Sequence, residues 1–187
     1  MNYTRFFITK KFLVSLLFLF ANFAIEAQVL TNAELKALNK QDYTDRTAET
    51  IDWSVVDAND KRRATRVLEL LNEGKVKTAE DFYNAGMIFQ HGSAPDDIKL
   101  AFSLSTISSR LAPTNPAPKW LAAAAWDRYM MWKKLPQWYG TQSQFFKETG
   151  KTVLYPVLPL AVTDAEREEA HVPSLAKIIA DIDAKNK

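Results

Sequence analysis

Two side chains near the middle of the chain, His91 and Asp127, are of the types that carry out acid and base chemistry. Histidine gains and loses a proton readily near neutral pH, and a carboxylate in an apolar site can act as an acid or hold a ligand. Each residue also has a structural explanation. His91 precedes Gly92 at a predicted helix end, where the helix dipole favours it, and Asp127 can pair with a cation or accept bonds from a neighbouring turn. Catalysis by this pair is therefore one hypothesis among several.

The position of Asp127 on its helix makes it unusual. A helix is predicted from about residue 119 to 133, and at 100° per residue Asp127 shares its face with apolar side chains, namely Trp120, Ala124 and Met131. An unpaired carboxylate on such a face would be costly, so Asp127 needs a partner, has a raised pKa or lines a solvated cleft. Arg128 lies at the edge of the same face, where it can pair with a carboxylate or hold an anionic ligand.

A polar segment follows this helix. Its amide and hydroxyl groups come from four candidate ligand-binding residues, Gln137, Tyr139, Thr141 and Gln142, and Gly140 permits a sharp bend. Such groups either orient a ligand or satisfy buried backbone where a helix gives way to a hairpin. The residue types fit both interpretations.

These residues together resemble a widespread bacterial family of unknown function. The resemblance runs from about residue 81 to the C-terminus and is carried by His91, Asp127-Arg128, Pro136-Gln137-x-Tyr139-Gly140-Thr141-Gln142, Asp164-x-x-Arg167 and Val172-Pro173-Ser174-Leu175. It implies that His91, Asp127, Arg128 and the polar residues of the segment form one constellation. It implies no activity. Trp138 stands at the variable position of the motif.

Other site chemistries have little support. The chain has no Cys, two His and a single Glu168-x-x-His171, whereas a di-iron helical site needs that arrangement twice and two more Glu. No metal and no cofactor are expected. No Gly-x-Ser-x-Gly motif is present, and Ser93 beside His91 is better explained as a helix cap. The charge run at residues 166–169 is typical of a solvated helix face.

The N-terminus has the pattern of a secretory signal. Basic residues precede an apolar run from Phe12 to Ile25, which is shorter than the roughly 20 residues that span a bilayer, and Ala27 is the predicted last residue of the signal. The alternative is an uncleaved N-terminal anchor. We expect an exported protein, periplasmic or extracellular, with residues 28–187 as a single domain and no transmembrane segment after cleavage.

The charge of the chain belongs to this signal. The formal net charge is +2, and residues 1–27 contain three basic side chains and one acidic, so the mature chain has no net charge. Without excess positive charge or a basic stripe, nucleic-acid binding is not expected. A domain of this length can also bury a core without disulfides, which agrees with the absence of Cys.

The predicted elements are mostly helices. Capping boxes at Thr31–Glu34 and Thr78–Asp81 begin the first and third helices, and the second runs from about Asn59 to Asn72. A fourth helix starts at residues 93–96, and a proline-rich break at residues 112–118 precedes the fifth. Residues 144–155 predict a short β-hairpin around Gly150, and two short helices begin near Thr163 and Pro173.

The whole pattern predicts a mainly α protein of stacked antiparallel helical hairpins, with one short β-hairpin in the C-terminal third. The favoured function is a binding or interaction module, with a polar pocket near Asp127 and residues 137–142, for a protein or small-molecule partner. The alternatives are an acid/base enzyme of hydrolase type that uses His91 and Asp127, or a purely structural helical scaffold. Whether the chain is an enzyme is left open.

Overall fold

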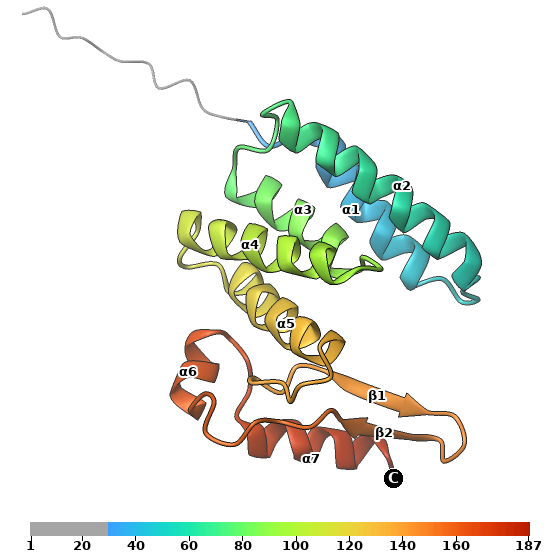
Figure 1. Ribbon diagram of the computed structural model, residues 1–187, viewed down its shortest axis with the longest axis vertical. Helices are drawn as coiled ribbons and strands as arrows, with labels where there is room; N and C mark the ends of the chain where they lie inside the picture. Colours follow the sequence, from blue (N-terminus) through green and yellow to red (C-terminus); the bar gives the residue numbers. More distant parts are fainter. Residues whose placement is uncertain (1–29) are drawn as a thin grey trace, which may run out of the picture.

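The computed structural model describes residues 30–187, and the predicted signal at residues 1–27 lies outside them. The described part contains seven helices and one two-stranded hairpin, which confirms the mainly α fold with a β-hairpin near the C-terminus (Figure 1). In order, the elements are α1 (Ala33–Arg46), α2 (Trp53–Asn72), α3 (Ala79–Gln90), α4 (Pro95–Leu111), α5 (Pro116–Trp132), β1 (Ser143–Phe146), β2 (Lys151–Leu154), α6 (Asp164–Glu169) and α7 (Leu175–Lys185).

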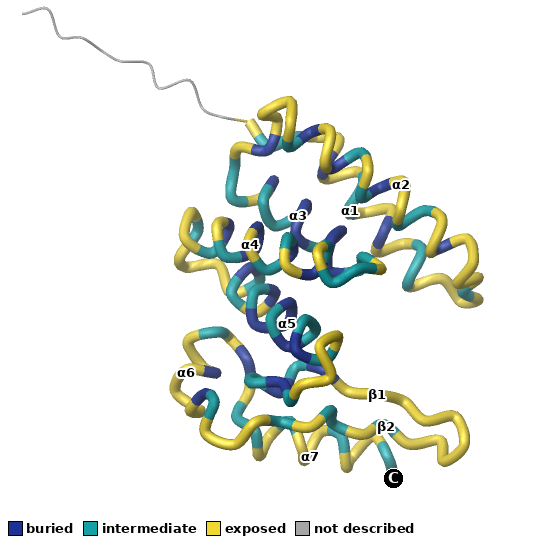
Figure 2. The backbone as a smooth tube through the Cα atoms, in the orientation of Figure 1, coloured by how far each residue is buried: buried dark blue, intermediate teal, exposed yellow. Residues whose placement is uncertain are grey.

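Helices α3 and α4 form the centre of the molecule. α3 packs against α1 and α4, and α4 packs against α5. Helices α1 and α2 lie at one end of the molecule, and the hairpin, α6 and α7 lie at the other end (Figures 1 and 2). The main core joins buried residues of the first five helices, among them Leu35, Leu70, Phe89, Leu104 and Ala125. A Cβ added at Gly86 would lie 2.9 Å from Ser105 Oγ and 3.5 Å from Ala101 O. Small residues thus let α3 and α4 approach closely.

Three predicted helix starts are wrong. α1 is capped by Asn32, whose side chain accepts from the amides of Glu34 and Leu35, while Thr31 bonds to Glu80 instead. The backbone amide of Asn32 also donates to Asp81, so a tertiary contact selects this cap. α2 begins at Trp53 rather than residue 59, because Asp52 accepts from the amides of Ser54 and Val55. α5 begins at Pro116 rather than residue 119.

The proline-rich break predicted at residues 112–118 is shorter in the structure, because α5 already begins at Pro116. Asn115 caps the helix by accepting from the amide of Ala117, and Pro116 and Pro118 lie in its first turn. The first amides of a helix have no partner within it, so prolines there cost no hydrogen bond. Fewer residues are therefore left for the connection between α4 and α5.

The capping boxes at the starts of α3 and α6 are present. Thr78 accepts from the amide of Asp81, and Thr163 accepts from the amide of Glu166. Asp81 is fully buried, and its carboxylate accepts from the backbone amides of Thr78, Lys77 and Asn32. Burial acts to raise the pKa of Asp81, but these hydrogen bonds outweigh it and hold the pKa below its ordinary value.

This buried carboxylate predicts sensitivity to acid. A carboxyl group whose pKa is lowered by folding adds stability above its unfolded pKa of about 3.9, and that stability is lost as the pH falls through the folded value. We expect Asp81→Asn to lower the free energy of unfolding at pH 7 by about 1–3 kcal/mol. It should also flatten the loss of stability below about pH 4. Urea unfolding between pH 2 and 7 measures both, with exposed Glu49→Gln as the control; equal acid slopes for Asp81→Asn and wild type would contradict the assignment.

The hairpin extends from the end of the molecule. β1 and β2 pair antiparallel, with Ser143 opposite Leu154 and Phe146 opposite Lys151, and every residue of β1 is exposed. α7 packs against β2, and the Asn186 side chain exchanges two hydrogen bonds with the backbone of Thr152. None of the helices within residues 30–187 has the length and apolar character needed to cross a membrane.

Candidate functional site

The carboxylate of Asp127 is completely buried, and both of its oxygens accept hydrogen bonds from other residues of the protein. Its Oδ1 accepts from the amides of Trp138 at 2.8 Å and Tyr139 at 3.0 Å, and its Oδ2 accepts from the amide and the hydroxyl of Thr141, both at 2.9 Å. Asp127 of α5 thereby fixes the segment that follows the helix. We call this segment, residues 137–142, the Trp-Tyr loop. The partners of this carboxylate on an apolar helix face are three backbone amides and one hydroxyl.

Gln137 closes the same loop from within. Its buried side chain donates to the carbonyls of Gln142 at 2.9 Å and Tyr155 at 2.8 Å, and it accepts from the amide of Gln142 at 2.8 Å. Its backbone pairs with the chain after β2, donating to Pro156 and accepting from Leu158. Because the backbone amide of Tyr155 also donates to the carbonyl of Gln142, the Gln137 side chain adds to a direct backbone contact between the loop and the end of β2.

Gln142 and Arg128 connect the loop to the helices. Arg128 donates to the side-chain oxygen of Gln142 at 3.3 Å and to the carbonyl of Gln90, at the end of α3, at 2.5 Å. Gln142 in turn donates to the carbonyl of Ala124 at 3.3 Å and to the Thr141 hydroxyl at 3.0 Å. Burial, and secondarily the charge of Arg46, lower the pKa of Arg128. Its described partners are neutral oxygens and no anion, so Arg128 joins α3, α5 and the loop.

A buried arginine that was not among the candidate site residues binds the loop from the side opposite to Asp127. Arg167 of α6 donates to the carbonyls of Tyr139 and Trp138, each at 3.0 Å, and to Val162 and Asp164. It is only 4% exposed, so the expectation of a solvated charge run at residues 166–169 is wrong for this member. Asp127 thus binds the amides of Trp138 and Tyr139, while Arg167 binds their carbonyls. The Asp164-x-x-Arg167 spacing was the available signal.

His91 belongs to a different cluster. Its Nδ1 lies 2.8 Å from Oδ2 of the buried Asp42 on α1, and Asp42 pairs with Arg46 at 2.7 Å. The fully buried Arg63 of α2 bonds to Asp45 at 2.7 Å and Asp60 at 2.5 Å. This α1–α2 charge cluster shares no hydrogen bond with Asp127. The structure therefore brings Asp127, Arg128, Gln137, Tyr139, Thr141 and Gln142 together and pairs His91 with Asp42.

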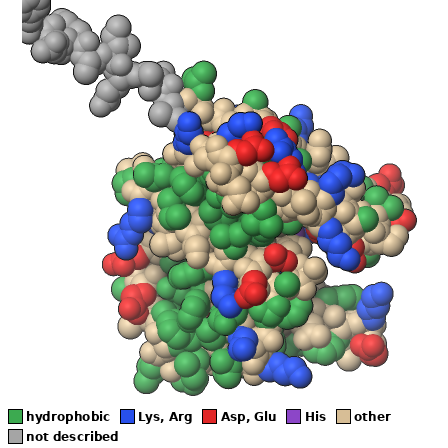
Figure 3. All heavy atoms as spheres, turned by 45° about the horizontal axis from the view of Figure 1, so that its top comes forward, with side chains coloured by type: hydrophobic (Ala, Val, Ile, Leu, Met, Phe, Trp, Pro, Cys, Tyr) green, Lys and Arg blue, Asp and Glu red, His purple; other side chains and the backbone are tan. Residues whose placement is uncertain are grey.

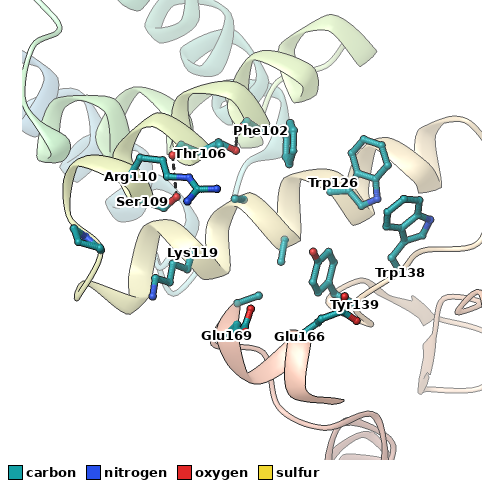
Figure 4. Close-up of a pocket in the computed structure, with 14 residues that line it drawn as sticks. Phe102, Thr106, Ser109, Arg110, Lys119, Trp126, Trp138, Tyr139, Glu166 and Glu169 are labelled. Atoms are coloured by element: carbon teal, nitrogen blue, oxygen red, sulfur yellow. Dashed lines mark hydrogen bonds between the residues drawn. The ribbon is translucent and has the colours of Figure 1, made fainter. Parts of the chain in front are cut away.

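The Trp-Tyr loop also forms one wall of a surface groove of about 830 Å³. The groove lies between α4, α5 and α6, and Figure 4 shows Trp126, Trp138 and Tyr139 turned toward it. We call it the aromatic groove. The Trp126 ring lies 5.5 Å from Phe102 and 4.9 Å from Trp138, measured between ring centroids, so the aromatic side chains support one another.

Polar groups surround this aromatic lining. Arg110 and Lys119 lie on the wall made by α4 and α5, and Glu166 and Glu169 lie on α6 (Figure 4). Burial raises the pKa of Tyr139, and the Asp127 and Glu166 carboxylates raise it further, so its phenol is neutral at physiological pH. Tyr139 is the one candidate ligand-binding residue from the sequence that lines the groove. Figure 3 shows how hydrophobic and charged side chains mix on one face of the molecule.

Among residues 30–187, no three His, Asp or Glu side chains lie together in an arrangement that could hold a metal ion. A second cavity, of about 360 Å³, is lined by His91, Ser93 and Asp97 together with residues of α2.

Comparisons with protein-family models, curated protein sequences and solved structures found no match.

Proposed function

We propose that this protein is an exported binding module that takes its ligand in the aromatic groove. The observation that carries the proposal is that two buried charged side chains bind the backbone of the Trp-Tyr loop. Asp127 accepts from the amides of Trp138 and Tyr139, and Arg167 donates to their carbonyls. That arrangement fixes the backbone and leaves both aromatic side chains on the groove wall.

Size and lining support a ligand site. Pockets that bind small molecules or short segments enclose about 300–1,000 Å³ and combine apolar walls with a few polar groups. The aromatic groove has this volume and this composition. Rigid aromatic residues also lose little conformational entropy on binding, and they are frequent among the residues that dominate binding energy.

The aromatic groove is a different site from the polar pocket that the sequence predicted. The sequence placed a polar pocket beside Asp127 and Gln137, but the polar atoms of both side chains are engaged inside the protein. In the proposed function these residues position the loop, and the ligand contacts the aromatic side chains. His91 and Asp127 then have structural roles in different parts of the fold.

An NMR titration tests the proposal. The indole N–H signals are followed while one pool of short peptides and one pool of oligosaccharides are added. We expect one of the pools to shift the signals of Trp126 and Trp138, which line the groove, while those of Trp53 and Trp132, which lie outside it, stay in place. Silence at Trp126 and Trp138 with both pools would refute the groove as a binding site.

A matched pair of variants extends this test. Trp138→Ala removes an aromatic wall of the groove and should weaken binding of the active pool at least tenfold, equivalent to about 1.4 kcal/mol. Trp132→Ala removes a tryptophan that is 44% exposed at the end of α5 and does not line the groove, so binding should be unchanged. Equal losses for the two variants would contradict the proposed function.

A further inference from the structure

We infer that the ligand of the aromatic groove is an extended peptide segment with an apolar anchor residue and an acidic group four residues further along. This inference rests on the proposed function and specifies its ligand. It comes from the separation of aromatic and charged side chains along the groove.

The groove has an aromatic end and a cationic end. Phe102 and Trp126 meet at one end, where Trp138 packs against Trp126. Arg110 and Lys119 lie at the other end, near the connection between α4 and α5 (Figure 4). α4 and α5 run in opposite directions along the groove, so each helix contributes one aromatic and one cationic residue to the same two ends.

The distance between the ends sets the length of the ligand. Phe102 and Arg110 are eight positions apart on α4, which corresponds to ~12 Å at 1.5 Å per residue. Trp126 and Lys119 are seven positions apart on α5, or ~10 Å. An extended peptide rises ~3.3 Å per residue, so about four residues cover this distance, and side chains four positions apart point to the same face. An apolar side chain at one end then places a carboxylate at the other.

The cationic end is available for a carboxylate. Neither Arg110 nor Lys119 is in an ion pair with another residue of the described chain. The facing wall carries the exposed carboxylates of Glu166 and Glu169. They attract a basic side chain from the middle of the peptide and repel a uniformly acidic one. This division of charge favours a peptide with both signs over a neutral glycan.

Four synthetic peptides test the inference by tryptophan fluorescence and NMR titration. Acetyl-Phe-Lys-Ala-Ala-Glu-amide has the inferred order of groups, and its isomer acetyl-Phe-Glu-Ala-Ala-Lys-amide has the two charges exchanged. Acetyl-Phe-Lys-Ala-Ala with a free carboxyl end distinguishes a terminal carboxylate from an acidic side chain. Acetyl-Ala-Lys-Ala-Ala-Glu-amide lacks the anchor, and a trimer of N-acetylglucosamine represents neutral glycans.

We expect the first peptide to bind at least about fivefold more tightly than its isomer, because each exposed ion pair contributes modestly. Arg110→Gln with Lys119→Gln should remove this preference, whereas Arg62→Gln, an exposed arginine on α2, should retain it. The preference should also shrink in high salt, because the charges are exposed. The peptide without the anchor should not bind measurably.

The outcomes separate this inference from the proposed function. Equal binding of the two isomers, with shifts at Trp126 and Trp138, would overturn the assigned ligand polarity and leave the groove as a binding site. Binding of the glycan trimer alone would overturn the peptide class in the same way. Absence of any shift with the four peptides also overturns the inference, while the broader pools decide the function.

Discussion

Replacing Asp127 with Asn is expected to lower the free energy of unfolding by about 2–4 kcal/mol. The carboxylate accepts four hydrogen bonds, from the amides of Trp138, Tyr139 and Thr141 and from the Thr141 hydroxyl. An Asn side chain has one accepting oxygen, and its NH₂ group would face donors that then lose their partner. Buried donors without a partner carry the full cost of desolvation. Urea denaturation at pH 7 measures the change.

The control for this prediction is Asp181→Asn. Asp181 is an exposed aspartate of α7 that pairs with Lys177, so its loss should cost no more than about 0.5 kcal/mol. If Asp127→Asn were neutral or stabilising, the carboxylate would not be needed to hold the loop. That result is typical of ligand-site residues, whose removal often costs no stability, and it would return Asp127 to the candidate ligand-binding residues.

Replacing Arg63 with Met is expected to have an effect of similar or larger size, about 3–5 kcal/mol. Arg63 is fully buried between α1 and α2 and bonds to Asp45 and Asp60, with Asp42 3.5 Å away. Hydrogen bonding to Arg63 is the main reason that the pKa of Asp45 lies below its usual range. Met fills a similar volume but leaves the carboxylates of Asp42, Asp45 and Asp60 close together without the charge of Arg63 to balance them. Thermal and urea unfolding measure the loss.

Two further variants make this prediction specific to charge. Arg62→Met changes the neighbouring, exposed arginine and should alter the free energy of unfolding by less than about 0.5 kcal/mol. Adding Asp60→Asn to Arg63→Met should restore part of the stability, because it removes one of the stranded carboxylates. If Asp60→Asn only added to the loss, packing rather than charge would explain the role of Arg63.

Local signals in the sequence predicted much of the fold. The capping residues Thr78 and Thr163 begin their helices as expected, because a short-range pattern of side chain and amide determines a cap. The helical wheel placed Asp127 on an apolar face, and the residue is indeed buried. At the start of α1 two adjacent capping residues competed, and the contact of Asn32 with Asp81, 49 positions away, decided between them.

The partners of the polar residues depend on contacts between distant segments. The His91 ring bonds to Asp42, which lies 49 positions earlier on α1, and Arg167 reaches the carbonyl of Trp138 from 29 positions later. Periodicity within one element says which face of a helix is apolar, but it does not say which backbone groups that face will meet. For the same reason, the aromatic groove has no signature in the sequence. It exists because α6 lies opposite α4 and α5.

Amide hydrogen exchange of the Trp-Tyr loop tests whether buried charges hold this loop so that its aromatic side chains line the groove. We expect slow exchange at the amides of Trp138, Tyr139 and Thr141, all bonded to Asp127, and fast exchange at the exposed hairpin tip, for example at Glu148. In Asp127→Asn these three amides should exchange much faster. Exchange of the three wild-type amides at the rate of Glu148 would mean that Asp127 does not hold the loop.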